Sequence, residues 1–209
     1  IGFIGFAAYP FLSGLLRKYK TRYPRVELRL EENVPSGQDI AFDRGEIDIG
    51  FTRPPSTGRG SSCESRLIFR EPLVAALPRG RKVTAKRIRI ADLASERFVI
   101  FQRASSPEVF DTIVRACNDN GFSPRLHNEL NNMHSVLSTV EAGEGVAIVP
   151  ASARNLRADN ISFVRLQPDN VRIDFVAIWR KNEPSIALKT FLELLDEELP
   201  AIRKKKRYT

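Results

Sequence analysis

The chain has 209 residues, of which 42% are hydrophobic and 28% are charged, and these values are ordinary for a globular protein. No apolar run approaches the roughly 18 residues that a membrane-spanning helix needs, so we expect no such helix within these residues. The net charge is +8, but five of the positive charges lie in the segment Arg203–Arg207. We therefore expect a solvated basic tail, and not a surface that binds nucleic acid directly.

The first residues and the cysteines favour a cytoplasmic protein. Residues 1–6 are apolar, but they are too few for a signal peptide and have no basic residue before them. The chain also lacks an initiator Met, so we expect that residues upstream are missing. Two cysteines, Cys63 and Cys117, do not indicate a disulfide framework. Cys117 falls on the apolar side of a predicted helix and is expected to be a small buried side chain in a reducing compartment.

Strands and helices are predicted to alternate over the first 55 residues. The expected elements are a buried strand at 1–5, a helix with its apolar face at Phe11, Leu15 and Tyr19, a strand at 26–30, a helix at 38–44 that ends at Gly45, and a strand at 47–51. This βαβαβ order is typical of a parallel sheet. A Gly- and Ser-rich loop is expected at 56–62.

The same alternation is predicted for the rest of the chain. The expected elements are a strand at 73–77, a basic turn at 78–82, a strand at 98–101, a helix with Val109, Ile113 and Cys117 that ends at Asn120-Gly121, a strand at 126–130, a helix at 133–140 that ends at Gly143, and strands at 146–149 and 175–179. A helix at 188–199 closes the chain.

The two halves also resemble each other. Pro24-Arg25-Val26 is matched by Pro124-Arg125-Leu126, at a spacing of roughly one hundred residues. We therefore predict an α/β fold with two Rossmann-like lobes of similar topology. Residues 1–72 with 175–209 form lobe I, residues 73–174 form lobe II, and the strands at 73–77 and 175–179 cross between the lobes.

Two arginines at strand ends suggest an anion site. Ligands in open α/β sheets bind beyond the carboxyl ends of the strands, so a cleft between the lobes is expected. Arg53 and Arg103 each follow a strand, and a guanidinium matches the geometry of a carboxylate. The helices that begin near Phe11, Ser36, Pro107 and Met133 present N-termini, which favour anions, to the same cleft. The alternative for each arginine is a surface ion pair with a nearby acid.

Apolar side chains are expected to line the same cleft. Phe6, Phe101, Val109, Phe110 and Met133 are the candidates. Pocket lining and core packing both remain open for Phe110, whereas Phe101 is expected in the core.

Signs of catalysis are few. The chain has two histidines, His127 and His134, and none of the common nucleotide-binding, metal-binding or nucleophile motifs. His134 opens a helix, where a polar structural residue and a ligand contact are the alternatives. We therefore predict no enzymatic activity, no cofactor and no metal site.

Several segments together resemble the effector-binding domain of LysR-type transcriptional regulators. The resemblance rests on Ile1–Gly5, on Tyr23-Pro24 with Val26–Leu28, on Arg44–Phe51, on Glu71–Pro78, and above all on Val140–Ser152. It extends from residue 1 to about residue 198, and the order and spacing of the motifs are more specific than any single motif. The subgroup that it resembles comprises the regulators of aromatic and chloroaromatic catabolism.

The resemblance implies the architecture and partners of that family. These are a periplasmic-binding-protein type 2-like fold, a small anionic effector such as an aromatic acid or a muconate, a missing N-terminal winged helix-turn-helix domain for promoter DNA, contact with RNA polymerase, and homodimers or homotetramers. Arg53 and Phe110 match ligand-contacting positions of the subgroup. The residues expected to bind the effector are Gly5, Phe6, Ala7, Pro35, Ser36, Thr52, Arg53, Arg103, Val109, Phe110 and Met133.

Two positions depart from the family pattern. Phe6 and Pro35 stand where the family usually has hydroxyl residues that contact the effector. Each lost hydrogen bond to a charged group is worth on the order of 1–3 kcal/mol. We therefore expect a ligand other than muconate, or one displaced toward Arg53 and Ser36.

Two other functions share this architecture. A solute-binding protein of an ABC-type transporter would have a signal peptide or lipoprotein cysteine upstream, whereas a regulator would have a helix-turn-helix there. An enzyme such as a deaminase or dehydratase would need convergent acid and base groups in the cleft.

Overall fold

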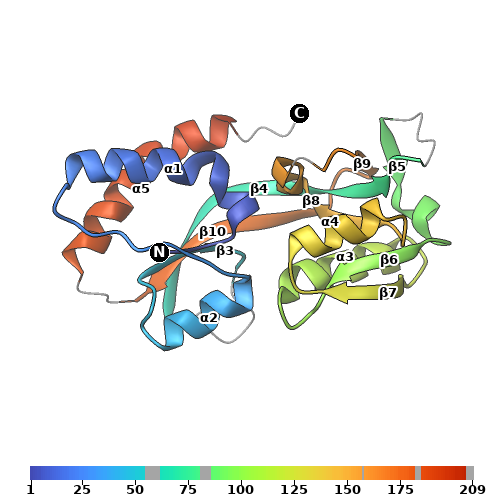
Figure 1. Cartoon of the computed structure of the whole chain (residues 1–209), viewed down its shortest axis with the longest axis horizontal. Helices are drawn as coiled ribbons and strands as arrows, with labels where there is room; N and C mark the ends of the chain where they lie inside the picture. Colours follow the sequence, from blue (N-terminus) through green and yellow to red (C-terminus); the bar gives the residue numbers. More distant parts are fainter. Residues whose placement is uncertain (55–61, 81–85, 157, 182–184, 206–209) are drawn as a thin grey trace. The chain divides into compact units, whose positions relative to one another are not determined.

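The computed structural model describes residues 1–54, 62–80, 86–156, 158–181 and 185–205. Residues 56–61 of the predicted loop at 56–62, the end of the basic turn at 78–82 and the last part of the basic tail fall outside these residues. The chain divides into two compact units (Figure 1). Unit 1 comprises Ile1–Arg70 and Asp174–Thr209, and unit 2 comprises Glu71–Ile173.

Unit 1 is built on a mixed sheet. Its elements are β1 (Gly2–Phe3), α1 (Gly5–Arg22), β2 (Glu31–Glu32), α2 (Pro35–Asp43), β3 (Ile49–Thr52), part of β4 (Cys63–Pro78), most of β10 (Arg172–Arg180) and α5 (Ile186–Lys205). β1 lies between β2 and β3 and is parallel to both. β10 runs antiparallel to β3 and is followed in the sheet by β4. β4 and β10 each have residues in both units.

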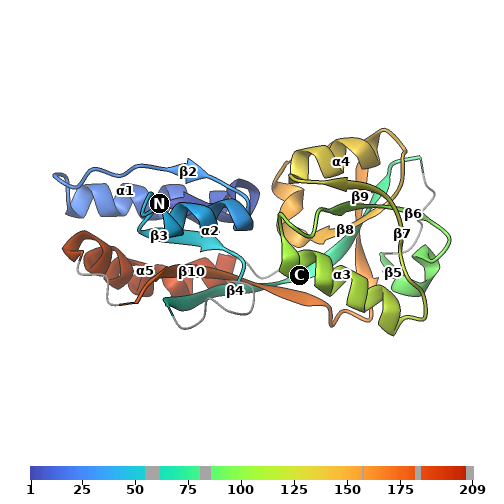
Figure 2. The same ribbon diagram turned by 90° about the horizontal axis from the view of Figure 1, so that it is seen from below.

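The core of unit 1 lies between its sheet and two long helices. α1 and α5 lie side by side on one face of the sheet, and α2 covers the other face (Figures 1 and 2). The larger cluster includes the buried rings of Phe11, Tyr19, Phe51, Phe175 and Phe191. A smaller cluster, beneath α2, joins Ala41, Phe42, Ile47, Val176 and Ile178. Burying one such large apolar side chain contributes about 1.5–3 kcal/mol, so these faces orient the helices.

Unit 2 contains two groups of strands. Its elements are the rest of β4, β5 (Arg87–Arg89), η1 (Ile90–Leu93), β6 (Arg97–Phe101), α3 (Pro107–Asp119), β7 (Arg125–Leu130), α4 (Met133–Glu141), β8 (Ala147–Pro150), η2 (Ala151–Leu156) and β9 (Ile161–Gln167). β4 pairs antiparallel with β8 and β9, and β5 is parallel to β9. β6 and β7 form a parallel pair, which a bridge between Phe98 and Val146 connects to the segment just before β8. α4 packs against β6, β7, β8 and β9.

Two predictions about the first strands are wrong. The strand predicted at 1–5 is only Gly2–Phe3, and α1 begins at Gly5, well before Phe11. The amide of Ile4 still donates to the carbonyl of Phe51 at 3.0 Å, but the carbonyl of Ile4 already accepts from the amide of Ala8 at 2.9 Å, so Ile4 joins the strand to the helix. Pro10 lies inside α1, although proline is typical of helix starts.

The strand predicted at 26–30 is the second wrong prediction. Residues 26–30 have no regular structure, and the residues that pair with β1 are Glu31 and Glu32. Val26 and Leu28 alternate because both pack against the core of unit 1. Their period of two therefore reflects burial and not a hydrogen-bonded ladder.

The other predicted elements are present, with different limits. β4 begins at Cys63, before the predicted Leu73, and β5 and β9 were not predicted. The predicted helix ends are confirmed at Gly45, Gly121 and Gly143, where φ is 69°, 84° and 82°. Glycine adopts this left-handed conformation without the steric cost that other residues incur.

Candidate functional site

The first half of the candidate site is the start of α1. Gly5 is the first residue of this helix, its N-cap residue Ile4 makes no side-chain cap, and the first turn has no acidic residue. Such an end favours an anion because the positive end of the helix dipole lies there, although the amide of Ala7 already donates to the carbonyl of Ile4 at 3.2 Å. Ala7 is buried, and the half-buried ring of Phe6 packs against the core of unit 1.

A carboxylate of the chain lies against this helix start. A Cβ added to Gly5 would be 2.6 Å from Cδ of Glu32, so the flexible carboxylate end of Glu32 would have to move to admit a larger residue. The register of β1 and β2 explains the approach, because Phe3 is paired with Glu32. The sequence pattern did not indicate Glu32, because it predicted a strand that ends at residue 30, before Glu32.

The start of α2 lies beside the end of β3. Pro35 is the first residue of α2, and Ser36 follows, half-buried. The fully buried Gln38 donates from Nε2 to the carbonyls of Asn33, at 3.3 Å, and Phe51, at 3.4 Å. These bonds tie the first turn of α2 to the neighbouring strands.

Thr52 and Arg53 complete this edge of unit 1. Thr52 ends β3 and is 2% exposed, and its hydroxyl has no hydrogen-bond partner within the described part of the chain. Arg53 is also 2% exposed. Its Nη1 donates to the carbonyl of Asp174 at 3.2 Å, and its Cζ lies 5.3 Å from the ring centroid of Phe175.

Unit 1 therefore brings seven of the predicted residues to one edge of its sheet. The parallel register sets β1 between β2 and β3, so the residues that follow these strands meet at their carboxyl ends. They are Gly5, Phe6, Ala7, Pro35, Ser36, Thr52 and Arg53. A buried guanidinium and two helix N-termini at the same edge of a sheet are groups that favour a carboxylate.

The other four predicted residues belong to unit 2. Arg103 is exposed and forms a fork with the carboxylate of Asp111, with Nε and Nη2 at 2.7 and 3.0 Å from its oxygens. This is the surface ion pair that the sequence left open. The hydrogen bond from Arg103 lowers the pKa of Asp111 below its ordinary value.

The apolar members of this set lie in the first turns of α3 and α4. Val109 and Met133 are buried, and Phe110 is half-buried. Asn132 caps α4, because its Oδ1 accepts from the amide of Ser135 at 2.8 Å. The prediction that the two sets of residues share one ligand stays a prediction.

Comparison with known proteins identifies the family. The model of the LysR substrate binding domain matches residues 1–200. The chain belongs to the LysR substrate-binding domain family. Two similar proteins are the HTH-type transcriptional regulators AlsR of Bacillus subtilis and BudR of Raoultella terrigena. AlsR is 29% identical over 93% of this chain and 64% of its own length. BudR is 30% identical over 86% of this chain and 62% of its own length.

This LysR substrate-binding domain also resembles solved structures. The effector-binding domain of a BenM variant gives a TM-score of 0.81 at 24% identity, over 96% of this chain and 93% of that one. CbnR, a LysR family transcriptional regulator, gives a TM-score of 0.78 at 26% identity, over 95% of this chain and 68% of the CbnR chain. These likenesses confirm the predicted periplasmic-binding-protein type 2-like fold. The chain spans about two thirds of the length of AlsR and BudR.

The relatives favour a regulator over the transporter protein that shares this fold. AlsR, BudR and the CatR protein of Pseudomonas putida are all named HTH-type transcriptional regulators.

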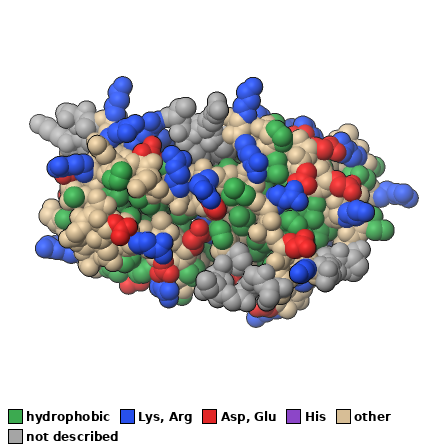
Figure 3. Space-filling view, turned by 180° about the vertical axis from the view of Figure 1, so that it is seen from behind, with side chains coloured by type: hydrophobic (Ala, Val, Ile, Leu, Met, Phe, Trp, Pro, Cys, Tyr) green, Lys and Arg blue, Asp and Glu red, His purple; other side chains and the backbone are tan. Residues whose placement is uncertain are grey.

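No helix among the described residues is both long and apolar enough to cross a membrane. Figure 3 shows Lys and Arg side chains scattered among acidic ones on the face drawn, with no single basic patch.

The reactive side chains of the LysR substrate-binding domain are dispersed. Within the described ranges, no group of three or more His, Cys, Asp or Glu side chains could hold a metal ion. His134 is exposed in the first turn of α4, and Nε2 of His127 lies 3.3 Å from the carboxylate of Glu144. Cys63 and Cys117 are free thiols, and burial raises the pKa of Cys117 to about 12. Cys117 is the small buried side chain that the sequence predicted.

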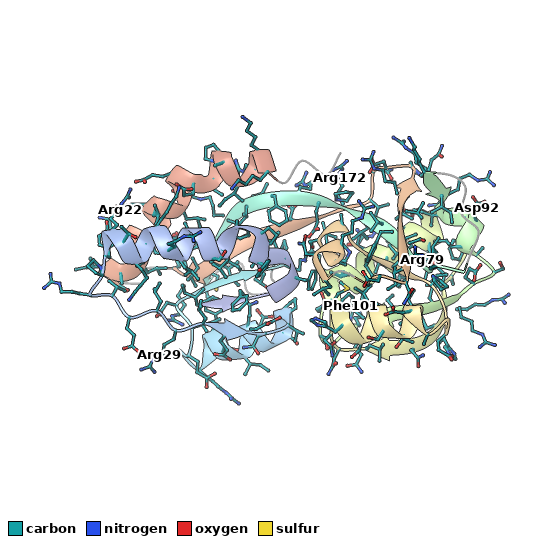
Figure 4. All side chains as sticks on the ribbon, turned by 45° about the horizontal axis from the view of Figure 1, so that its top comes forward. Arg22, Arg29, Arg79, Asp92, Phe101 and Arg172 are labelled. Atoms are coloured by element: carbon teal, nitrogen blue, oxygen red, sulfur yellow. The ribbon has the colours of Figure 1, made fainter. Side chains whose placement is uncertain are left out.

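Unit 1 also has a pocket of about 280 Å³ at the amino ends of its strands. Its lining includes Ile1, Tyr19, Arg29, Asp48 and Phe191; Figure 4 labels Arg29. The predicted effector residues do not line it, because they follow the strands and the pocket lies before them.

Proposed function

We propose that this chain is the effector-sensing part of a transcription regulator and that it binds a small carboxylate through Arg53. The observation that carries the proposal is the burial of Arg53, which follows β3 at the edge of the sheet where α1 and α2 begin. A buried guanidinium interacts strongly with a carboxylate, since little water screens the charges. Phe110 and Met133 of unit 2 are proposed to contact the apolar body of the ligand, and Arg103 its rim.

An aromatic acid is the ligand class that we propose. One of the solved relatives is the BenM effector-binding domain with its effector benzoate. Phe6 and Pro35 have no hydroxyl for a second carboxylate, so a monocarboxylate is favoured over a muconate. We expect Phe6→Ser to strengthen binding of cis,cis-muconate, measured by calorimetric titration. Equal muconate affinity in both proteins would contradict this role of Phe6.

The proposed mechanism is a shift between conformations. An effector changes the conformational equilibrium only by the difference in its affinity for the two states. In the whole regulator, a helix-turn-helix domain outside this chain would transmit the shift to promoter DNA and RNA polymerase. We also propose that the whole regulator forms homodimers or homotetramers in the cytoplasm. This chain is proposed to have no enzymatic activity.

A thermal-shift screen of the chain tests the proposal. Benzoate, substituted benzoates and cis,cis-muconate are added to the wild type, to Arg53→Ala and to Arg103→Ala. At about 100 times its Kd, a true ligand adds roughly 2.7 kcal/mol to the free energy of unfolding. We expect a monocarboxylate to stabilise the wild type, to stabilise Arg103→Ala less strongly, and to have no effect on Arg53→Ala.

A second variant at Arg53 distinguishes loss of ligand binding from misfolding caused by the substitution of a buried residue. Arg53→Gln keeps an amide donor and removes the charge, so it separates loss of the fold from loss of the ligand. Undiminished stabilisation of a folded Arg53→Ala or Arg53→Gln protein would refute Arg53 as the carboxylate-binding residue. A wild type that no acid stabilises would refute the anionic effector.

A further inference from the structure

We propose that Phe175, Asp174 and Arg70 are positioning residues that fix the guanidinium of Arg53 before a ligand arrives. The inference rests on the proposed function, in which Arg53 binds the carboxylate. It assigns a second group of residues, on β4 and β10, to the affinity of that site.

Arg53 contacts two consecutive residues of β10. The guanidinium is buried, and it donates to the carbonyl of Asp174 while its Cζ lies 5.3 Å from the ring centroid of Phe175. A desolvated guanidinium needs acceptors, and an aromatic face adds to its stabilisation. Two consecutive residues of one strand therefore contribute to the orientation of the side chain.

Two pairs of residues hold this part of β10 in place. The carboxylate of Asp174 accepts a fork from Arg70, with Nε at 2.5 Å and Nη2 at 3.0 Å from its oxygens. The ring of Phe175 stacks on Phe69, with centroids 4.9 Å apart and planes 15° apart. β4 and β10 are neighbours in the sheet, and consecutive side chains of a strand point to opposite faces. The ion pair and the ring pair therefore fix the same strand segment from its two faces.

The ion pair between Arg70 and Asp174 is exposed, so it can be removed with little effect on the stability of the fold. The side chains of Arg70 and Asp174 are 59% and 28% exposed, so their pair adds little to global stability. Its loss should, however, loosen the carbonyl that holds Arg53. An ordered guanidinium binds more tightly than a mobile one, because less conformational entropy is lost on binding. The expected signature is weaker ligand binding with nearly unchanged stability.

Calorimetric titration of the whole chain with benzoate measures the effect on affinity. We expect Arg70→Gln to weaken benzoate binding by roughly three- to tenfold. Phe175→Leu keeps apolar volume but removes the aromatic face, and we expect a loss of roughly three- to thirtyfold. The reversed pair, Arg70→Asp with Asp174→Arg, should restore the affinity to within about twofold of the wild type.

Arg22→Gln is the matched control. Arg22 extends from the carboxyl end of α1 (Figure 4) and makes a similar exposed fork with Glu197, with both bonds at 2.9 Å. This pair belongs to the same unit but does not contact Arg53. Its loss should leave benzoate affinity unchanged and lower the melting temperature as little as Arg70→Gln does.

A measurement without ligand decides the inference even if benzoate does not bind. NMR relaxation gives the order parameter of the Arg53 Nε–H group, whose signal is identified by its disappearance in Arg53→Lys. We expect an order parameter of about 0.8 for this group in the wild type and in Arg22→Gln. In Arg70→Gln and Phe175→Leu we expect it to fall below about 0.6. Equal order in all four proteins would overturn the inference.

The affinity results separate the two proposals. If Arg53→Ala abolishes benzoate binding while Arg70→Gln and Phe175→Leu bind as the wild type does, the proposed function stands and the positioning role is refuted. If Arg53→Ala binds benzoate normally, the proposed function itself fails.

Discussion

Arg53 and Arg103 both follow a strand, but only Arg53 is buried. A buried guanidinium loses its hydration, so it is retained where contacts of the protein or of a ligand compensate for that loss. Arg103 stays largely hydrated and is paired with Asp111, so its contribution to binding an anion is expected to be the smaller one.

The ion pair of Arg103 should affect stability at low pH. The pKa of Asp111 is lowered in the folded state, mainly by its hydrogen bond from Arg103. A lowered folded-state pKa stabilises the fold above the pKa of the unfolded chain, and this stabilisation is lost as the pH falls through the folded-state value. The pair is exposed, so screening by solvent keeps this contribution small. We expect Asp111→Asn to show a shallower loss of stability between about pH 5 and pH 2 than the wild type.

NMR titration of the carboxyl groups provides the control. In Arg103→Gln, the pKa of Asp111 should return toward its ordinary value, whereas that of Glu197, lowered by its hydrogen bond from Arg22, should not change. An Asp111 pKa that stays low in Arg103→Gln would contradict the assignment of its cause.

At the scale of elements, close contacts between neighbours decide where the strands can lie. Gly2 and Gly50 face each other across β1 and β3, and Gln38 of α2 approaches both. A Cβ on Gly50 would lie 2.9 Å from the ring of Phe42, and it would also meet Oε1 of Gln38. The two glycines thus let α2 approach the sheet and carry its N-terminus to the candidate site.

Substitution of Gly50 tests this packing. We expect Gly50→Ala to lower the free energy of unfolding by about 1–3 kcal/mol, because the methyl group overpacks the interface between α2 and β3. Gly14→Ala in α1 is the control, since nothing lies within 4 Å of its added Cβ. It should raise the free energy of unfolding by about 0.5–1 kcal/mol through its higher helix propensity. Denaturant unfolding measures both, and an unaffected Gly50→Ala protein would disprove the close approach.

At the scale of the whole molecule, the two units differ in how the chain forms them. Unit 2 is continuous from Glu71 to Ile173, whereas unit 1 combines the first 70 residues with the end of the chain. The core of unit 1 needs Phe175, Leu188 and Phe191 from that end. β4 keeps its partners β8 and β9 within unit 2.

Fragments of the chain should reflect this difference. We expect residues 71–173 to fold alone with a cooperative thermal transition, and residues 1–70 to remain unfolded because they lack β10 and α5. Circular dichroism and amide NMR dispersion measure both. A cooperative transition in the fragment 1–70 would show that the core of unit 1 does not depend on the end of the chain.

Much of the candidate site could be predicted from the chain. The βα alternation placed Thr52 at a strand end and Arg53 just after it, and it placed Met133 at a helix start, because strand ends and caps are encoded locally. The approach of Glu32 to Gly5 could not be predicted, since it depends on the register of β2. That register is set by pairing with β1 and not by the residues of β2 alone.

The sequence by itself determined the class of fold, the family and the helix ends at Gly45, Gly121 and Gly143, because periodicity and left-handed glycines are local properties. The tertiary structure alone decided that Arg53 is buried against Phe175 whereas Arg103 pairs with Asp111. It also decided that residues 26–30 pack without forming a ladder. The physical reason is that burial and pairing depend on segments far apart in the chain, and local periodicity does not report which of them meet.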